Sequence, residues 1–126
     1  MSELIYIRLD GDNIGDAIEY FLKKKDYSNA QNVHNKVQKA IKYLLSKIES
    51  NHYEVLMSGA DDILFTISKD QYNKSFLFKL CSDFSNITSH TISLGVGESL
   101  KDCQSNLNQA KKSGKNKIIE PLTLKK

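Results

Sequence analysis

Tryptophan is absent from this sequence, proline occurs once and cysteine only twice. No apolar run approaches the roughly 20 residues that a membrane-spanning helix needs. The first nine residues lack the basic start and long apolar segment of a secretory signal, so we expect a cytoplasmic protein without a membrane partner. Cys81 and Cys103 lie far apart and form no Cys-x-x-Cys motif. This predicts buried free thiols and excludes the usual disulfide and zinc patterns.

Histidine is also rare, and the net charge is small. His34, His52 and His90 share no spacing typical of metal ligands, so we assign them no chemical role. The net charge is only +3, and no basic stretch is interleaved with aromatic residues, so direct binding of nucleic acid is not expected. The charge is uneven, however, because the chain from Lys101 onward holds seven lysines and two acids. That end should attract anions.

The 126 residues suit one domain, 1–126, with a single core. Residues 3–9 are apolar at both odd and even positions, which predicts a central strand covered on both faces. Residues 90–96 alternate between small or polar and large apolar side chains, which predicts a half-buried strand. Apolar spacing and turn signals predict the remaining elements. They are strands at 53–57, 63–67 and 118–119, and helices at 16–25, from Ser28 or Asn29 through Ile48, at 70–84 and at 100–112.

This order of elements predicts an α+β fold: a ferredoxin-like split βαβ with an antiparallel or mixed sheet, an extra C-terminal helix and an edge strand. A right-handed crossover makes the first two strands parallel, with the third running back between them. Asp10, at the end of the first strand, then lies beside the hairpin tip that carries Asp61 and Asp62. The returning C-terminal helix brings Lys111 and Lys115 to the same edge.

The chemistry of this edge follows from its residue types. Clustered carboxylates repel one another unless a cation neutralises them, and an oxygen-rich set suits Mg²⁺ or Mn²⁺. Backbone N–H groups of residues 11–15 can cradle phosphates, and the two lysines can hold outer phosphates. Together these are the parts of a phosphoryl or nucleotidyl transfer site. A plainer interpretation also stays open, in which the acids only form turns and the lysines only complement a helix dipole.

Two motifs carry a resemblance to a known family. Residues 10–15 (Asp-Gly-Asp-Asn-Ile-Gly) after a buried strand, with residues 59–62 (Gly-Ala-Asp-Asp) on a hairpin, resemble the palm domain of the CRISPR polymerase subunit and its stand-alone relative, the minimal CRISPR polymerase (mCpol). Residues 110–116 (Ala-Lys-Lys-Ser-Gly-Lys-Asn) are similar to the ending of the GGDEF diguanylate cyclases. The resemblance covers nearly the whole chain.

The resemblance implies a set of site residues. Asp10, Asp61 and Asp62 would be catalytic, with Asp62 acting on the attacking ribose hydroxyl. The implied ligands of Mg²⁺ or Mn²⁺ are Asp10, Gly11, Asp61 and Asp62. The implied nucleotide contacts belong to the first turn, the hairpin and the last helix, and they are Gly11, Asp12, Asn13, Ile14, Gly15, Gly59, Lys111 and Lys115.

The resemblance also implies an activity. A homodimer would join two ATP molecules into cyclic di-adenylate with release of pyrophosphate, in antiviral defence, and a downstream effector would read the product. Ile18 and Tyr27 stand where diguanylate cyclases carry guanine-reading residues, which argues against GTP. Two alternatives remain, a catalytically silent palm that binds nucleotide as a sensor or scaffold and a nucleotide hydrolase similar to a GTP cyclohydrolase. The intact acidic set favours the synthase over the silent palm.

Overall fold

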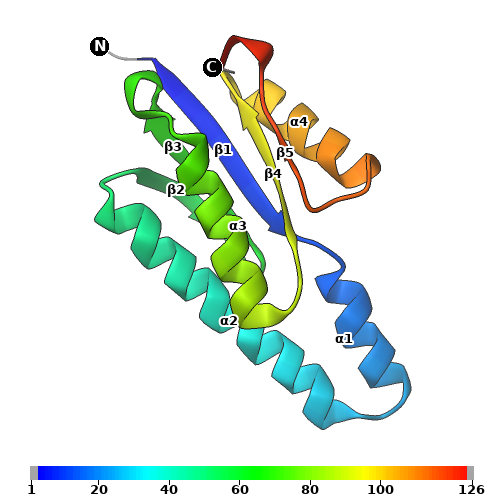
Figure 1. Cartoon of the computed structure of the whole chain (residues 1–126). Coiled ribbons are helices and arrows are strands. Elements are labelled where there is room, and N and C mark those ends of the chain that lie inside the picture. Colours follow the sequence, from blue (N-terminus) through cyan, green and yellow to red (C-terminus); the bar gives the residue numbers. More distant parts are fainter. Residues whose placement is uncertain (1–2, 125–126) are drawn as a thin grey trace.

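The computed structural model describes residues 3–124, which form one five-stranded sheet with helices on both faces (Figure 1). The strands are β1 (Leu4–Gly11), β2 (Glu54–Ser58), β3 (Asp62–Ser68), β4 (Ile92–Gly97) and β5 (Ile118–Ile119). The helices are α1 (Ile14–Lys23), α2 (Tyr27–Ser50), α3 (Lys74–Thr88) and α4 (Leu100–Lys112), with short 3₁₀ turns η1 (Lys69–Gln71) and η2 (Leu122–Leu124).

The strand order is β2-β3-β1-β4-β5. β3 runs antiparallel between β1 and β2, β4 is antiparallel to β1, and β5 is parallel to β4. The predicted α+β split βαβ fold, with its mixed sheet and its added helix and edge strand, is therefore confirmed. This topology places the end of β1, the start of β3 and the end of α4 at one edge of the sheet.

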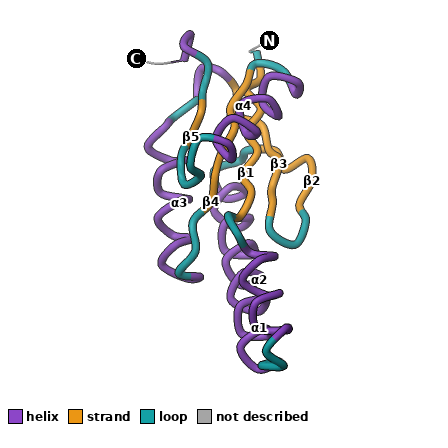
Figure 2. Tube along the Cα trace, turned by 90° about the vertical axis from the view of Figure 1, so that its right-hand side faces the viewer, coloured by secondary structure: helices purple, strands orange, loops and turns teal. Residues whose placement is uncertain are grey.

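The main core lies between the sheet and the two helices α2 and α3. Ile5, Ile7 and Leu9 of β1 are fully buried there, whereas the alternate side chains of β1 point to the other face. On that face α4 packs mainly on β4 and also contacts β1, and β2 lies farther along the sheet (Figure 2). Leu64 of β3 lines a cavity together with Leu100 and Gln104 of α4. The prediction that β1 is covered on both faces is therefore wrong in part, because its second face is only half-buried.

The opposite correction applies to β4, whose six residues are all buried. Two glycines explain why this strand is not half-exposed. A methyl group on Gly95 would lie 2.3 Å from the carbonyl oxygen of Cys103, and one on Gly97 would lie 2.3 Å from the Cys103 nitrogen. The lack of side chains lets the α4 backbone rest directly on β4, so the predicted polar face of this strand is covered.

The starts of α1, α2 and α3 differ from the predicted positions, whereas α4 has the predicted bounds. α2 is capped by Asp26, whose side chain accepts a hydrogen bond from the Asn29 N–H at 3.2 Å, and not by Ser28 or Asn29. α3 begins after the η1 turn, with Asn73 accepting from the N–H of Ser75 at 2.9 Å. No helix within residues 3–124 is long and apolar enough to cross a membrane.

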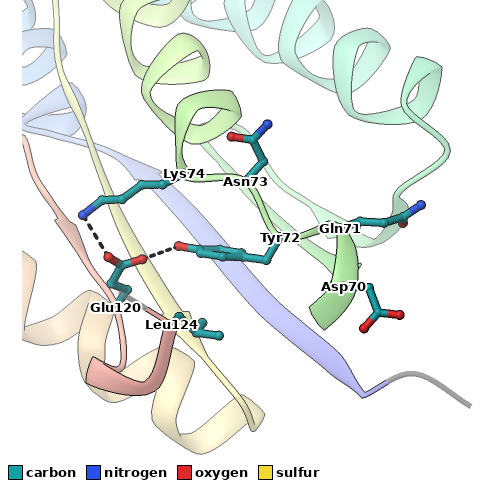
Figure 3. Close-up of a pocket in the computed structure, with 7 residues that line it drawn as sticks. All are labelled: Asp70, Gln71, Tyr72, Asn73, Lys74, Glu120 and Leu124. Atoms are coloured by element: carbon teal, nitrogen blue, oxygen red, sulfur yellow. Dashed lines mark hydrogen bonds and ion pairs between the residues drawn. The ribbon is translucent and has the colours of Figure 1, made fainter. Parts of the chain in front are cut away.

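Hydrogen bonds connect the C-terminal segment to the start of α3, at the end of the sheet away from the acidic turns. Glu120 follows β5, and its side chain is only 2% exposed. It accepts hydrogen bonds from the Tyr72 hydroxyl at 2.6 Å and from Lys74 Nζ at 2.9 Å (Figure 3). Burial and the neighbouring carboxylate raise the pKa of Tyr72, so this phenol stays a donor. The pair holds β5 against the sheet.

Candidate functional site

Three carboxylates predicted from separate parts of the sequence meet at one edge of the sheet. Asp10, near the end of β1, is the direct cross-strand partner of Asp62 at the start of β3. Asp61 precedes it in the hairpin turn, and its carbonyl oxygen accepts a hydrogen bond from the Gly11 N–H at 2.9 Å. This bond ties the end of β1 to the hairpin tip, so the two acidic turns form a single site.

The electrostatics of the cluster favour a cation. Burial raises the pKa of Asp61, and the neighbouring carboxylates of Asp10 and Asp62 raise it further. Burial likewise raises the pKa of Asp10, although the Lys111 ammonium acts in the opposite direction. Raised values mean that the ionised forms are destabilised by their surroundings, and a bound dication would relieve that cost.

Lys111 already places a positive charge on part of this cluster. Its Nζ donates to the carbonyl oxygens of Gly11 at 2.9 Å and Asp10 at 3.2 Å, and to Asp12 Oδ1 at 2.7 Å. It also lies 3.5 Å from Asp10 Oδ2. Four oxygens thus surround one cation, and three of them belong to the predicted metal ligands Asp10 and Gly11.

Asp12 has a different task from the predicted phosphate contact. The residue is 2% exposed, and its carboxylate accepts from Thr91 Oγ1 at 2.7 Å, Ser93 Oγ at 2.8 Å and the Asn116 N–H at 3.0 Å, besides Lys111. Its own N–H donates to the Thr91 carbonyl at 2.8 Å. Neither group is available to a ligand, so Asp12 joins the first turn to β4 and to the loop after α4.

The start of α1 offers the phosphate-binding groups. The N–H groups of Asn13, Ile14 and Gly15 have no hydrogen-bond partner among residues 3–124, because they belong to the first turn of a helix. Asn13 has φ of 59°, and its side chain accepts from Lys115 Nζ. Free N–H groups at a helix N-terminus, with an ammonium beside them, suit an anion.

The loop that delivers Lys115 has an unusual backbone. Gly114, Lys115 and Asn116 have φ values of 112°, 64° and 51°, so three successive residues are in the left-handed region. Left-handed non-glycine residues are costly and tend to cluster at functional sites. Here the conformation directs the Lys115 side chain to Asn13 and the Asn116 N–H to the buried carboxylate of Asp12.

The hairpin tip is held from two sides. Gln38 on α2 donates through Nε2 to the Ala60 carbonyl at 3.2 Å, and the Gly59 N–H donates to the Asp62 carbonyl at 2.9 Å. A methyl group on Gly59 would lie 2.2 Å from Asp62 Oδ1. Gly59 therefore makes room for the Asp62 carboxylate, a steric task besides the nucleotide contact that the resemblance implies.

Two functional neighbours were missed from the sequence, Arg8 and Gln38. Arg8 Nη2 lies 2.8 Å from Asp62 Oδ2. Because alternate residues of a strand share a face, the spacing of two between Arg8 and Asp10 was a usable signal. Gln38 carried no signal, since its contact depends on how α2 packs beside the hairpin.

A cavity of about 200 Å³ opens beside the acidic turn. It lies between α1, α2 and the hairpin, and it is lined by Ile14, Gly15, Ile18, His34, Val37, Gln38, Ala60 and Asp61. Of the two positions compared with guanine-reading residues, Ile18 lines this cavity, whereas Tyr27 is 58% exposed and does not. The lining is mostly apolar, which suits a flat ring.

The donor set fits Mg²⁺ or Mn²⁺. Within residues 3–124, no group of three or more His, Cys, Asp or Glu side chains is arranged to hold a metal ion. Mg²⁺ does not need one, because it is commonly held by one or two carboxylates, water and substrate phosphates. Asp10, Asp61 and the Gly11 carbonyl provide hard oxygen ligands of that kind, and the Lys111 ammonium shows that this place accepts a positive charge.

The fold is shared with solved structures of two groups. A Csm1-Csm4 cassette in complex with cA4 matches with a TM-score of 0.72 and 19% identity, over 91% of this chain and 20% of that chain. A Csm1-Csm4 cassette in complex with one ATP matches with a TM-score of 0.72 and 20% identity, over 92% of this chain and 20% of that one. This chain thus spans about a fifth of the length of these relatives.

The second group consists of cyclase domains. The active GGEEF domain of a diguanylate cyclase from Vibrio cholerae matches with a TM-score of 0.56 and 14% identity, over 93% of this chain and 81% of that chain. At such identities these likenesses show the fold alone, and no curated protein matches the sequence. The model of the mCpol family, the minimal CRISPR polymerase domain, matches residues 6–120, and the chain therefore belongs to this family.

Proposed function

We propose that the chain is a cytoplasmic nucleotidyltransferase, dependent on Mg²⁺ or Mn²⁺, that converts ATP into a cyclic oligonucleotide, most simply cyclic di-adenylate, with release of pyrophosphate. The observation that carries the proposal is the meeting of Asp10 and Asp61 beside the free N–H groups at the start of α1. Carboxylates for a dication and N–H groups for a triphosphate are the two halves of such a site. The mCpol family and the fold shared with cyclases support a nucleotidyltransferase role.

ATP would bind along the start of α1. The N–H groups of Asn13, Ile14 and Gly15 would donate to phosphate oxygens, and Lys111 and Lys115 would contact the outer phosphates. Both lysines have flexible stems and already lie over this turn. The phosphates would then lie between the α1 dipole and the end of α4.

The adenine ring would occupy the cavity beside the turn. Ile14, Ile18 and Val37 provide apolar contact, and His34 and Gln38 provide polar groups at its wall. The cavity adjoins Asp61, so the base and the reacting phosphate would lie on either side of the hairpin tip. Ile18 has no hydrogen-bonding group for a guanine edge, which favours ATP over GTP.

The reaction would form one P–O bond and break another. A metal held by Asp10, Asp61 and the Gly11 carbonyl would neutralise charge at the α-phosphate and activate the attacking hydroxyl. Asp62 would orient a ribose hydroxyl and accept its proton. The hydroxyl oxygen attacks the α-phosphorus, the bond to pyrophosphate breaks, and two such steps close a cyclic dinucleotide with release of two pyrophosphates.

Each chain has one acidic cluster, so two facing copies would present two nucleotides to each other. β2 leads into the hairpin turn that carries Asp61, and four of its five residues are exposed, so this strand would admit the partner. A downstream effector would read the product in antiviral defence.

The test is product analysis. Purified protein is incubated with each nucleoside triphosphate and Mg²⁺, and the products are identified by mass spectrometry, with Asp61→Ala as the inactive control and the exposed Asp16→Asn as the matched active control. A cyclic adenylate that is lost in Asp61→Ala supports the proposal. Unchanged but bound triphosphate would indicate a silent nucleotide-binding palm, and an opened purine ring would indicate a hydrolase.

A further inference from the structure

Arg8 joins the acidic cluster to α4 through side chains that hold it at two points. Its Nη2 lies 2.8 Å from Asp62 Oδ2, and its Nη1 donates to Gln104 Oε1 at 3.0 Å. Gln104 in turn donates through Nε2 to Asn108 Oδ1 at 3.1 Å. A guanidinium bound at two separate nitrogens has one orientation, unlike a loosely paired surface charge.

One face of α4 carries Lys111 and the residue that contacts Arg8. Gln104, Asn108 and Lys111 follow one another at spacings of four and three, so they share a helix face. Lys111 reaches Asp10 directly, and Gln104 reaches Asp62 by way of Arg8. Side chains of α4 thus hold two of the three carboxylates, Asp10 directly and Asp62 through Arg8. Asp61 has no ion-pair partner among residues 3–124.

The Arg8 contact leaves the two oxygens of Asp62 unequal. Oδ2 is bound by the guanidinium, whereas Oδ1 accepts no hydrogen bond from any side chain or N–H group within residues 3–124 and lies against Gly59. A methyl group at position 59 would require Oδ1 to move. Arg8 therefore holds Oδ2 in place, and Gly59 leaves the space in which Oδ1 lies.

We propose that Arg8 is a positioning residue for nucleotidyl transfer: it holds Asp62 by one oxygen and reserves the other for the attacking ribose hydroxyl. The inference rests on the proposed function. It gives Asp62 a role apart from Asp10 and Asp61, because a carboxylate held by a guanidinium is a poor metal ligand. Loss of Arg8 would free Asp62 to turn toward the metal, so metal binding would improve while catalysis declined.

The test is a double-mutant cycle of Arg8→Met and Asp62→Asn, followed by kcat, by KM for ATP and by direct Mn²⁺ binding without nucleotide. Arg8→Met should lower kcat about tenfold to a hundredfold with KM unchanged, and Arg8→Lys should restore part of the loss. In the Asp62→Asn background Arg8→Met should have less than about a twofold effect on kcat. Mn²⁺ should bind Arg8→Met about tenfold more tightly than wild type.

One further variant is the matched control. Lys69→Met removes a positive charge that pairs with Glu98 at the other end of the sheet and should change neither kcat nor Mn²⁺ affinity. Additive losses in the cycle, or weaker Mn²⁺ binding by Arg8→Met, would overturn the proposal. If the wild-type chain forms no product, the proposed function fails, and Mn²⁺ affinity still decides the role of Arg8: tighter binding by Arg8→Met must disappear in Arg8→Met/Asp62→Asn.

Discussion

Replacing Asp12 by asparagine should destabilise the folded chain, although the substitution conserves volume. The buried carboxylate accepts four hydrogen bonds, two at each oxygen: Ser93 Oγ and Lys111 Nζ at Oδ1, and Thr91 Oγ1 and the Asn116 N–H at Oδ2. An asparagine amide keeps one acceptor oxygen and turns an NH₂ group toward the other two donors.

The magnitude follows from these contacts. The charge-assisted bond to Lys111 contributes about 1.5–3 kcal/mol, and a buried donor left without an acceptor costs about 1–3 kcal/mol. The free energy of unfolding should therefore fall by about 3–5 kcal/mol, as for a buried ion pair that loses one partner. For a chain of this size the melting temperature would drop by about 10–20 °C.

Urea denaturation and thermal melting of Asp12→Asn measure this effect, with Asp16→Asn as the matched control. Asp16 is exposed in the first turn of α1, so its substitution should cost less than about 0.5 kcal/mol. Equal stability of the two variants would refute the structural role of Asp12.

The pH dependence of stability gives the same residue a second test. Burial alone would raise the pKa of Asp12, but hydrogen bonds from Lys111, Thr91, Ser93 and the Asn116 N–H together lower it. A lowered native pKa means that the stabilisation is complete above the unfolded value near 4 and is lost as pH falls through the native value. Wild type should lose this contribution below about pH 4, and Asp12→Asn should not.

Three other predictions concern the packing of α4, the thiols and the site lysine. Gly95→Ala should destabilise the fold by about 3 kcal/mol in urea denaturation, because its methyl group would meet the α4 backbone, whereas Gly15→Ala, with open space around it, should not. Cys81 and Cys103 should react with iodoacetamide only on unfolding, because burial raises their pKa values to about 12 and about 11; rapid native labelling would contradict this. Lys111→Met should weaken ATP binding about tenfold and tighten Mn²⁺ binding without nucleotide about tenfold, both measured by calorimetry. If both affinities changed in the same direction, Lys111 would not occupy the place of the metal.

Much of the fold could be predicted from local patterns together with one rule of handedness. The period of the long helix, the apolar runs and the hairpin signals defined the elements, and the right-handed crossover placed Asp10 beside Asp61. The direction of the chain brought Lys111 to that edge, because a strand that runs away from the edge must be followed by a helix that returns to it. These inferences needed no knowledge of side-chain contacts.

The remaining features depend on contacts between distant parts of the chain. Asp12 was predicted to contact the nucleotide because its buried partners, Thr91 just before β4 and Ser93 within it, come about 80 residues later in the chain. β4 looked half-exposed because Gly95 gave no sign that a helix would rest on it. Sequence patterns report which face a residue occupies, but they do not report what covers that face.

The central claim is that Asp10 and Asp61 form a catalytic metal site, and pyrophosphate release tests it most directly. Wild type, Asp10→Asn, Asp61→Asn and Asp16→Asn are each incubated with ATP, with Mg²⁺ or with EDTA, and pyrophosphate is measured over time. We predict release by wild type and Asp16→Asn only with Mg²⁺, and rates lower by about a hundredfold or more in the other two variants. Release that persists in Asp61→Asn, or that survives EDTA, would contradict the assignment of this site.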